Sequence, residues 1–246
     1  MSNRKKPLYA QQMKDLERRY QKVSGLKDRS SYAIFYCPVR PAPVLVLGIN
    51  PGGHPENVYP DGVRLRSGPG RGAASTGYYE NNEHCMLDCD WPENRIVPLL
   101  ASLLGDREAI RDKVVKSNLA FRRAPNVREF ERVHPGMTIL DAYEEAQPFI
   151  REIIGIVQPR LVILESGKKE FLPTFNRCAG TTRSTSLGDP KAAPKIGNIT
   201  VFRAERATIP NVPGQALVVQ IPHPSRFHWT YERAGVVGRI RRGLYA

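Results

Sequence analysis

Two short turns in this sequence carry polar side chains of the types that enzymes use in hydrolysis. The first, Gly-Ile-Asn-Pro-Gly at residues 48–52, places the amide of Asn50 directly after an apolar run. Its carbonyl oxygen can position a water molecule, although an amide cannot act as a strong base. The second, Ile-Pro-His-Pro-Ser-Arg, places the imidazole of His223 where it can donate to developing negative charge. Ser225 and Arg226, which follow it, suit phosphate oxygens.

The elements that position these turns read as alternating strands and helices. Continuous apolar runs are typical of strands buried on both faces of a sheet, whereas apolar residues spaced by three or four indicate helices. This alternation predicts a three-layer α/β/α sandwich with a central, mostly parallel sheet of four to five strands. The predicted strands are 43–49, 114–121, 160–165, 199–204 and 216–221, and the predicted helices are 8–23, 92–104, 139–157, 167–175 and 231–244.

In such a fold, ligands bind outside the carboxyl ends of the strands. Asn50 and His223 each follow a predicted strand, so the two turns can meet across one crevice although 173 positions separate them. Either turn alone is compatible with a structural role, as an ordinary strand-to-helix turn or as a satisfied histidine in a proline-rich loop. The combination of the two therefore carries the functional argument.

The charge of the chain favours an anionic partner. There are 37 Lys and Arg against 24 Asp and Glu, a net charge of +13, which is typical of contact with nucleic acid or an anionic membrane face. A basic protein without such a partner is the alternative. The longest apolar runs are far below the ~18 residues of a membrane span, and the first twenty residues show no apolar signal segment. We expect no membrane association, and a cytoplasmic protein, or a nuclear one in a eukaryote.

The cysteine pattern does not predict a metal centre. The four cysteines include no Cys-x-x-Cys pair, the usual mark of a structural zinc site. His84, Cys85 and Cys89 form a loose cluster whose spacing is poor evidence for a ligand set. We expect reduced thiols, no metal and no organic cofactor.

Together, the two turns resemble the signature motifs of the uracil-DNA glycosylase superfamily. Gly-Ile-Asn-Pro-Gly (48–52) is similar to the water-activating motif of the mismatch-specific branch, which also carries Asn there, and His-Pro-Ser (223–225) is similar to the motif near the C-terminus of most branches. Ser-Asn-Leu (117–119) lies where the family places an Asn that reads the edge of the pyrimidine. The order of motifs and elements agrees over roughly residues 43–245.

The resemblance implies a role for each matching residue. Asn50 would position the water that attacks the sugar C1′, and His223 would stabilise negative charge on the base O2. Asn118 would bond the O4/N3 edge and help to reject cytosine. Ser225 would hold a backbone phosphate, with Arg226 directed towards the duplex. The implied activity is that of a monofunctional DNA glycosylase that flips its target base out of the helix.

Further site residues follow from the same resemblance and from the charge pattern. The base pocket would include Gly48, Ile49, Gly52 and Gly53, and Gly53 in place of the tyrosine of the classical branch suggests room for thymine, hypoxanthine or xanthine. Tyr78 is the first candidate for the aromatic ring that stacks on the base. The residues expected at the DNA are Ser225, Arg226, Phe227, Arg122, Arg64 and Arg66.

The organisation expected from the sequence is one domain over residues 1–246, with a basic helical segment at 1–30, acting as a monomer on damaged or mismatched DNA. Glu165 and Glu170, near strand ends, are interpreted as surface or capping residues. Two alternatives stay open: a member of this fold that binds a modified base or free nucleotide without catalysis, and a nucleic-acid-binding accessory protein that uses the fold as a scaffold.

Overall fold

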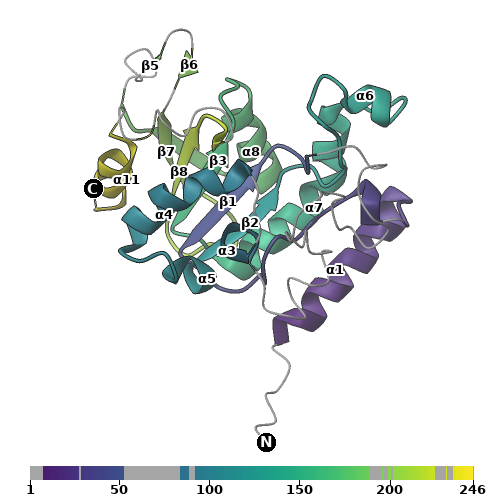
Figure 1. Ribbon diagram of the computed structural model, residues 1–246, viewed down its shortest axis with the longest axis horizontal. Helices are drawn as coiled ribbons and strands as arrows, with labels where there is room; N and C mark the ends of the chain where they lie inside the picture. Colours follow the sequence, from purple (N-terminus) through teal and green to yellow (C-terminus); the bar gives the residue numbers. More distant parts are fainter. Residues whose placement is uncertain are drawn as a thin grey trace, which may run out of the picture.

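The computed structural model describes most of the chain (Figure 1). The described residues are 8–27, 29–52, 84–88, 92–188, 195–196, 199–200, 202–224, 231 and 235–245.

A six-stranded sheet forms the centre of the fold, in the order β2-β1-β3-β8-β7-β4. The first four of these strands are parallel to one another, and β7 and β4 run antiparallel at one edge. The strands are β1 (Val44–Gly48), β2 (Val114–Asn118), β3 (Leu161–Glu165), β4 (Arg183–Ser186), β7 (Arg203–Thr208) and β8 (Ala216–Ile221), with a separate ladder of β5 (Lys195–Ile196) and β6 (Ile199–Thr200).

The predicted fold class is confirmed, whereas the number of strands is one more than the sequence indicated. The additional strand, β4, is exposed along its whole length and reads Arg-Ser-Thr-Ser, so it carries no apolar pattern. The predicted strand 199–204 is divided, because 199–200 belong to the small ladder and β7 begins at Arg203. Edge strands of this kind need little burial, which is why hydrophobic patterning misses them.

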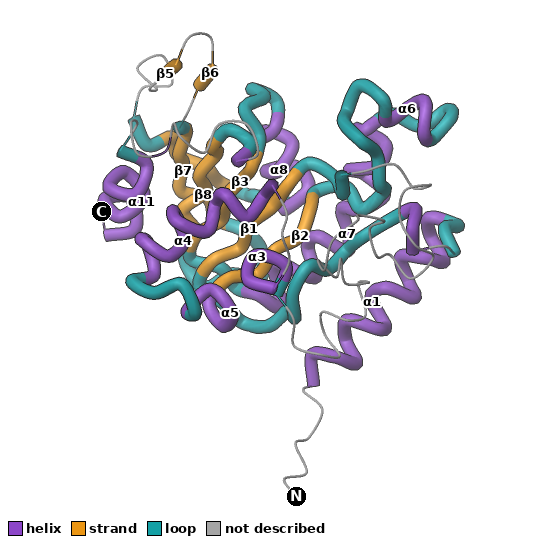
Figure 2. Tube along the Cα trace, in the orientation of Figure 1, coloured by secondary structure: helices purple, strands orange, loops and turns teal. Residues whose placement is uncertain are grey.

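Helices cover both faces of the sheet (Figures 1 and 2). One core joins the sheet to α7 and α8, with α1 packed beside α7, and a second joins the other face to α3, α4, α5 and α11. The helices are α1 (Leu8–Ser24), η1 (Arg29–Ser31), α3 (Cys85–Asp88), η3 (Pro92–Ile96), α4 (Val97–Leu104), α5 (Ala109–Lys113), α6 (Phe130–Val133), α7 (Ile139–Val157), α8 (Phe171–Ala179) and α11 (Val236–Tyr245).

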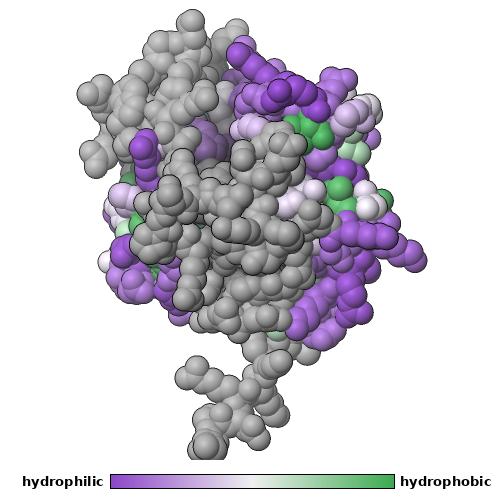
Figure 3. All heavy atoms as spheres, turned by 45° about the vertical axis from the view of Figure 1, so that its right-hand side comes forward, coloured by the Kyte–Doolittle hydropathy of each residue, from purple (hydrophilic) through white to green (hydrophobic). Residues whose placement is uncertain are grey.

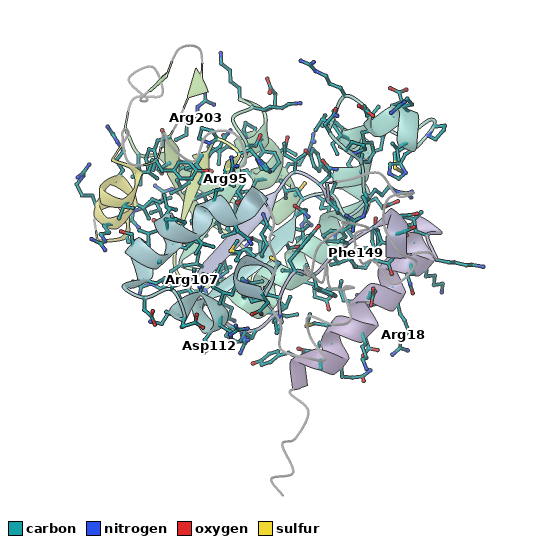
Figure 4. All side chains as sticks on the ribbon, in the orientation of Figure 1. Arg18, Arg95, Arg107, Asp112, Phe149 and Arg203 are labelled. Atoms are coloured by element: carbon teal, nitrogen blue, oxygen red, sulfur yellow. The ribbon has the colours of Figure 1, made fainter. Side chains whose placement is uncertain are left out.

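The longest helix, α7, shows how local sequence sets these elements. The Thr138 hydroxyl accepts from the Asp141 amide and the Asp141 carboxylate accepts from the Thr138 amide, a capping box that begins the helix at the predicted residue. Phe149 of α7 faces α1, where its ring meets that of Tyr20 edge-on at 5.5 Å (Figure 4). Aromatic contacts of this type fix how α1 lies against α7.

On the face drawn in Figure 3, the described residues that can be seen are mainly hydrophilic. Among the described residues, the exposed large apolar side chains are Val23 in α1, Leu140 in α7 and Leu187 just after β4. Within the described part of the chain, no helix combines the length and the apolar character needed to cross a bilayer.

Candidate active site

The carboxyl ends of the four parallel strands form one edge of the sheet, and two polar side chains, those of Asn118 and Glu165, stand in the row of residues along it. Asn118 is the register partner of Gly48, and Glu165 is the partner of Ile221. The last register pair of β1 and β3 is Leu47 with Leu164. The next residues of the two strands, Gly48 and Glu165, therefore lie side by side. The row across the edge therefore runs Asn118, Gly48, Glu165, Ile221.

Asn50 and His223 stand at the same edge, each two positions beyond this row. Their strands, β1 and β8, are separated by β3 alone. Two strand spacings of about 4.8 Å put about 10 Å between the two backbones. Both side chains are partly buried. The sheet order thus brings the two distinctive turns of the sequence to the same edge.

The side-chain amide of Asn50 is fixed by the main chain. Its Nδ2 donates to the carbonyl of Pro51 at 2.9 Å and to that of Ala124 at 3.0 Å. Because both partners are acceptors, the amide nitrogen must face them and Oδ1 must point away. Asn50 consequently offers an acceptor, which is the group that can hold a water molecule through one of its hydrogens.

The turn at 49–52 is tied to the segment that follows β2. The amides of Ala120 and Ala124 donate to the carbonyls of Ile49 and Pro51. The buried guanidinium of Arg123 donates to the carbonyl of Gly52 at 2.7 Å. Arg123 therefore holds the turn in place, a role that its position in a run of two arginines does not reveal.

Asn118 is buried, and its position requires the glycine beside it. Its Nδ2 donates to the Tyr36 hydroxyl at 2.9 Å. A Cβ atom on Gly48 would clash with Oδ1 of Asn118 and would stand 3.3 Å from Nζ of Lys116. The φ of Gly48 is not positive, so the backbone conformation does not require glycine there. Glycine is needed because any side chain at position 48 would prevent this close approach of Asn118. Tyr36 is a site residue that the sequence did not single out.

A buried ion pair crosses β1 at this glycine. Lys116 on β2 donates to Oε2 of Glu165 on β3, and their side chains are 6% and 0% exposed. The prediction that Glu165 is a surface or capping residue is therefore wrong, because Glu165 is the buried counter-ion of Lys116, a lysine inside the fully buried strand β2. Lys116 could have indicated this pair from the sequence, because a charged side chain inside a buried strand needs a partner of opposite charge.

The hydroxyl of Tyr231 is bonded to the main chain just after β8. It donates to the carbonyl of Pro222, immediately before His223, at 2.7 Å. Burial, and secondly the Glu165 carboxylate, raise the pKa of Tyr231 far above its usual range. The register of β3 with β8 pairs Glu165 with Ile221, two residues before His223.

Arg122, expected at a phosphate-contacting surface, has its partners inside the fold. Its guanidinium forms an ion pair with Glu145 at 2.7 Å, with both side chains 11% exposed, and donates to the carbonyl of Ser24. Tyr20 donates to the same carboxylate. Arg122 therefore links α1, α7 and the segment after β2.

Glu170 is exposed just before α8 and makes no side-chain cap there. The other predicted site residues lie outside the described residues: Gly53, Arg64, Arg66, Tyr78, Ser225, Arg226 and Phe227.

His84 is committed to backbone hydrogen bonds. Its Nε2 lies 3.0 Å from the carbonyl of Val114, and its Nδ1 accepts from the amide of Met86 at 3.2 Å. Burial is the main cause that lowers the pKa of His84 to about 4. With both ring nitrogens engaged, His84 has none left for a metal. Among the described residues, no three His, Cys, Asp or Glu side chains gather as a ligand set.

A scan against protein-family models and a search of curated proteins found no match to this chain.

Proposed function

We propose that this protein is a DNA glycosylase that hydrolyses the N-glycosidic bond of uracil, or of a related deaminated or mismatched base, after flipping that base out of the duplex. The observation that carries the proposal is the common edge. Asn118 ends β2, Asn50 and His223 follow β1 and β8, and all three stand where α/β folds bind ligands. The similarity of their motifs to those of the uracil-DNA glycosylase superfamily assigns a role to each.

Asn50 would position the attacking water through Oδ1. Its amide hydrogens are both given to main-chain carbonyls, so the acceptor is held in a fixed direction. An amide cannot remove a proton from water, but the sugar in such reactions becomes oxocarbenium-like and needs little nucleophilic push. A fixed acceptor is sufficient for that task, because it supplies orientation rather than basicity.

Asn118 would read the polar edge of the base. Tyr36 takes one amide hydrogen, which leaves the second hydrogen as a donor and Oδ1 as an acceptor. A donor next to an acceptor complements the O4 and N3–H of uracil. Cytosine presents the reverse pattern, an amino group next to a bare ring nitrogen, and would leave the buried amide mispaired. Sites built to hydrogen-bond one pattern discriminate strongly against its absence.

His223 would donate to the base O2 as negative charge develops there. In comparable oxyanion sites, one donor contributes about 3–4 kcal/mol to the transition state. The two prolines around His223 stiffen the turn, so the imidazole is directed before the substrate arrives.

The DNA backbone would be held by cations around this edge. Lys168 and Lys169 are exposed on the loop after β3, the strand that separates the two turns. The net charge of +13 would add long-range attraction that falls with salt.

The test is excision from labelled oligonucleotides, single- and double-stranded, that carry uracil, U·G, T·G, hypoxanthine or xanthine. Abasic sites are detected by alkaline cleavage. We expect wild-type protein to cleave at one or more of these bases, and His223→Ala to slow cleavage at least about 100-fold. Asn118→Asp should change the ratio of uracil to cytosine excision. Glu152→Gln alters a carboxylate that pairs with Arg19 between α1 and α7 and serves as the control.

No cleavage of any substrate by the wild-type protein would reject the proposal. If tight, salt-dependent binding accompanied that result, the scaffold alternative would replace it.

A further inference from the structure

An arginine stands at the start of β7, at the same edge of the sheet as the candidate site. Because β7 runs antiparallel to β8, its first residue, Arg203, is the register partner of Gln220 near the end of β8. Figure 4 shows Arg203 at the upper end of the sheet. His223 follows Gln220 by three residues of chain, which span at most about 11 Å. Arg203 is therefore a neighbour of the candidate site.

The guanidinium of Arg203 is not engaged by the part of the chain that the structure describes. Its Nε is buried and makes no hydrogen bond, and no ion pair holds the group. Glu205, two residues further along β7 and on the same face, accepts instead from the amide of Asn176 on α8. A buried guanidinium nitrogen without an acceptor is costly, so the position of Arg203 has to be explained by another interaction.

Gln220 keeps an unused acceptor beside this arginine. Its side chain is buried, and Nε2 donates to the carbonyls of Ser166 at 2.5 Å and Lys168 at 2.6 Å. Its Oε1 is also buried and has no partner among the described residues. Opposed residues of an antiparallel pair lie on one face, with Cβ atoms about 5 Å apart. The unused Oε1 and the unused Nε of Arg203 are therefore neighbours, and rotation of the arginine side chain can join them.

Two more cations stand on the loop that Gln220 holds. Lys168 and Lys169 are exposed there, with Glu170 as the acidic residue that follows them. Once Nε of Arg203 donates to Gln220, the two terminal nitrogens of its guanidinium form a planar fork. Such a fork matches two oxygens of one phosphate group. The three cations together suit a polymer of phosphates better than a single carboxylate.

We propose that Arg203 binds a backbone phosphate of DNA next to the nucleotide in the candidate site, and that Gln220 is the residue that positions it. The inference deepens the proposed function, on which it rests for the identity of the polymer. Gln220 accepts from Nε while it holds the loop of Lys168 and Lys169, so the three cations approach the same strand. Contacts to phosphate fix the position of the strand and do not distinguish one base from another.

The test is the affinity for DNA as a function of salt. A fluorescent single-stranded oligonucleotide without a damaged base is titrated with protein between about 50 and 200 mM salt, and anisotropy gives the Kd. Arg203→Ala should weaken binding about 10-fold, the loss of one hydrogen bond to a charged group. The slope of log K against log salt should fall in magnitude by about 1, because one phosphate contact is lost. Arg203→Lys keeps the charge but lacks Nε and the fork, so it should keep the slope and bind more weakly than wild-type protein.

Arg183→Ala is the matched control. Arg183 is exposed on β4 and lies opposite Thr208, at the other end of β7 from Arg203. The variant loses the same single charge and should keep the wild-type affinity and slope. Equal losses in Arg183→Ala and Arg203→Ala would show an effect of net charge alone and would overturn the contact.

The positioning role of Gln220 is tested by a double-mutant cycle. Gln220→Met removes Oε1 at a similar side-chain volume, and thermal unfolding shows whether each variant is folded. The substitution should weaken DNA binding more in wild-type protein than in Arg203→Ala, because part of its effect passes through Arg203. An equal effect in both backgrounds would mean that Gln220 does not act on Arg203.

The undamaged oligonucleotide carries no base to excise, so these results are independent of excision. Wild-type affinity and slope in Arg203→Ala would overturn the phosphate contact and leave the glycosylase proposal intact. Wild-type protein that does not bind the oligonucleotide would also overturn the contact. If wild-type protein excises no base but binds DNA through Arg203, the glycosylase proposal is rejected and the phosphate contact is supported.

Discussion

Replacing Gly48 by alanine tests the geometry on which the whole site depends. The added Cβ would clash with Oδ1 of Asn118 and stand 3.3 Å from Nζ of Lys116. The backbone at Gly48 has no positive φ, so alanine causes no conformational strain there. The atom in the way belongs to a side chain with two torsions. The easiest response is therefore rotation of Asn118 away from Tyr36.

The expected cost can be worked out from this response. Rotation breaks one buried hydrogen bond, a loss of about 1 kcal/mol, and forces an unfavourable side-chain torsion, a further cost of about 1 kcal/mol. A loss of about 2 kcal/mol in a chain of this size lowers the unfolding temperature by about 4–8 °C. Because Asn118 no longer faces the base, excision of uracil should fall more than stability, by at least about 10-fold.

Gly155→Ala is the matched control. Gly155 lies in α7, and its added Cβ would meet Cβ of Asn211 at 3.7 Å, an ordinary contact. Alanine in a helix interior is favoured over glycine by up to about 1 kcal/mol, so this variant should unfold at the wild-type temperature or a few degrees higher. Thermal unfolding and uracil excision are measured on both variants. Wild-type stability and excision in Gly48→Ala would refute the close approach of Asn118 to β1.

Three further perturbations test other parts of the structure. Arg122→Ala should lower the free energy of unfolding by about 3 kcal/mol, because it leaves Glu145 buried without its cation; an altered salt dependence of DNA affinity would instead show that Arg122 contacts phosphate. His84 has its pKa lowered to about 4 in the folded state, so the unfolded chain binds a proton first and stability is lost as pH falls from about 6.5 towards 4. The loss should reach about 3 kcal/mol by urea unfolding, and His84→Gln should flatten it. Thr138→Ala should cost about 1 kcal/mol in the same assay, and no change would mean that the capping box does not stabilise α7.

Much of the fold could be predicted because its signals are local. The strands at 44–48, 161–165 and 216–221 are mainly apolar runs, and α7 has both an apolar face and a capping residue. The prediction failed where the apolar pattern of the sequence and the extent of the strand do not coincide. The polar β4 has no apolar pattern, and β2 ends at Asn118 although its apolar pattern continues to Phe121.

The residues of the candidate site also differ in whether the sequence could predict their roles. Asn50 and His223 could be chosen from the sequence, because each stands just after an apolar run, whereas Asn118 was chosen through the resemblance of Ser-Asn-Leu (117–119) to the family's motif. Arg122 and Glu165 could not be interpreted correctly, because a charged residue type does not reveal whether its partner is water or another buried charge. Both have partners distant in the chain, Glu145 and Lys116.

The sequence by itself determined the layered α/β class, the long helices, and which turns could carry chemistry, because propensity, capping and hydrophobic period act over a few residues. The tertiary structure decided the strand order that puts β3 between the two turns, and the approach of Lys116 to Glu165 across Gly48. These contacts join residues about 50 to 120 positions apart. Packing of the whole sheet against its two helical layers selects them, and no local pattern in the chain specifies that choice.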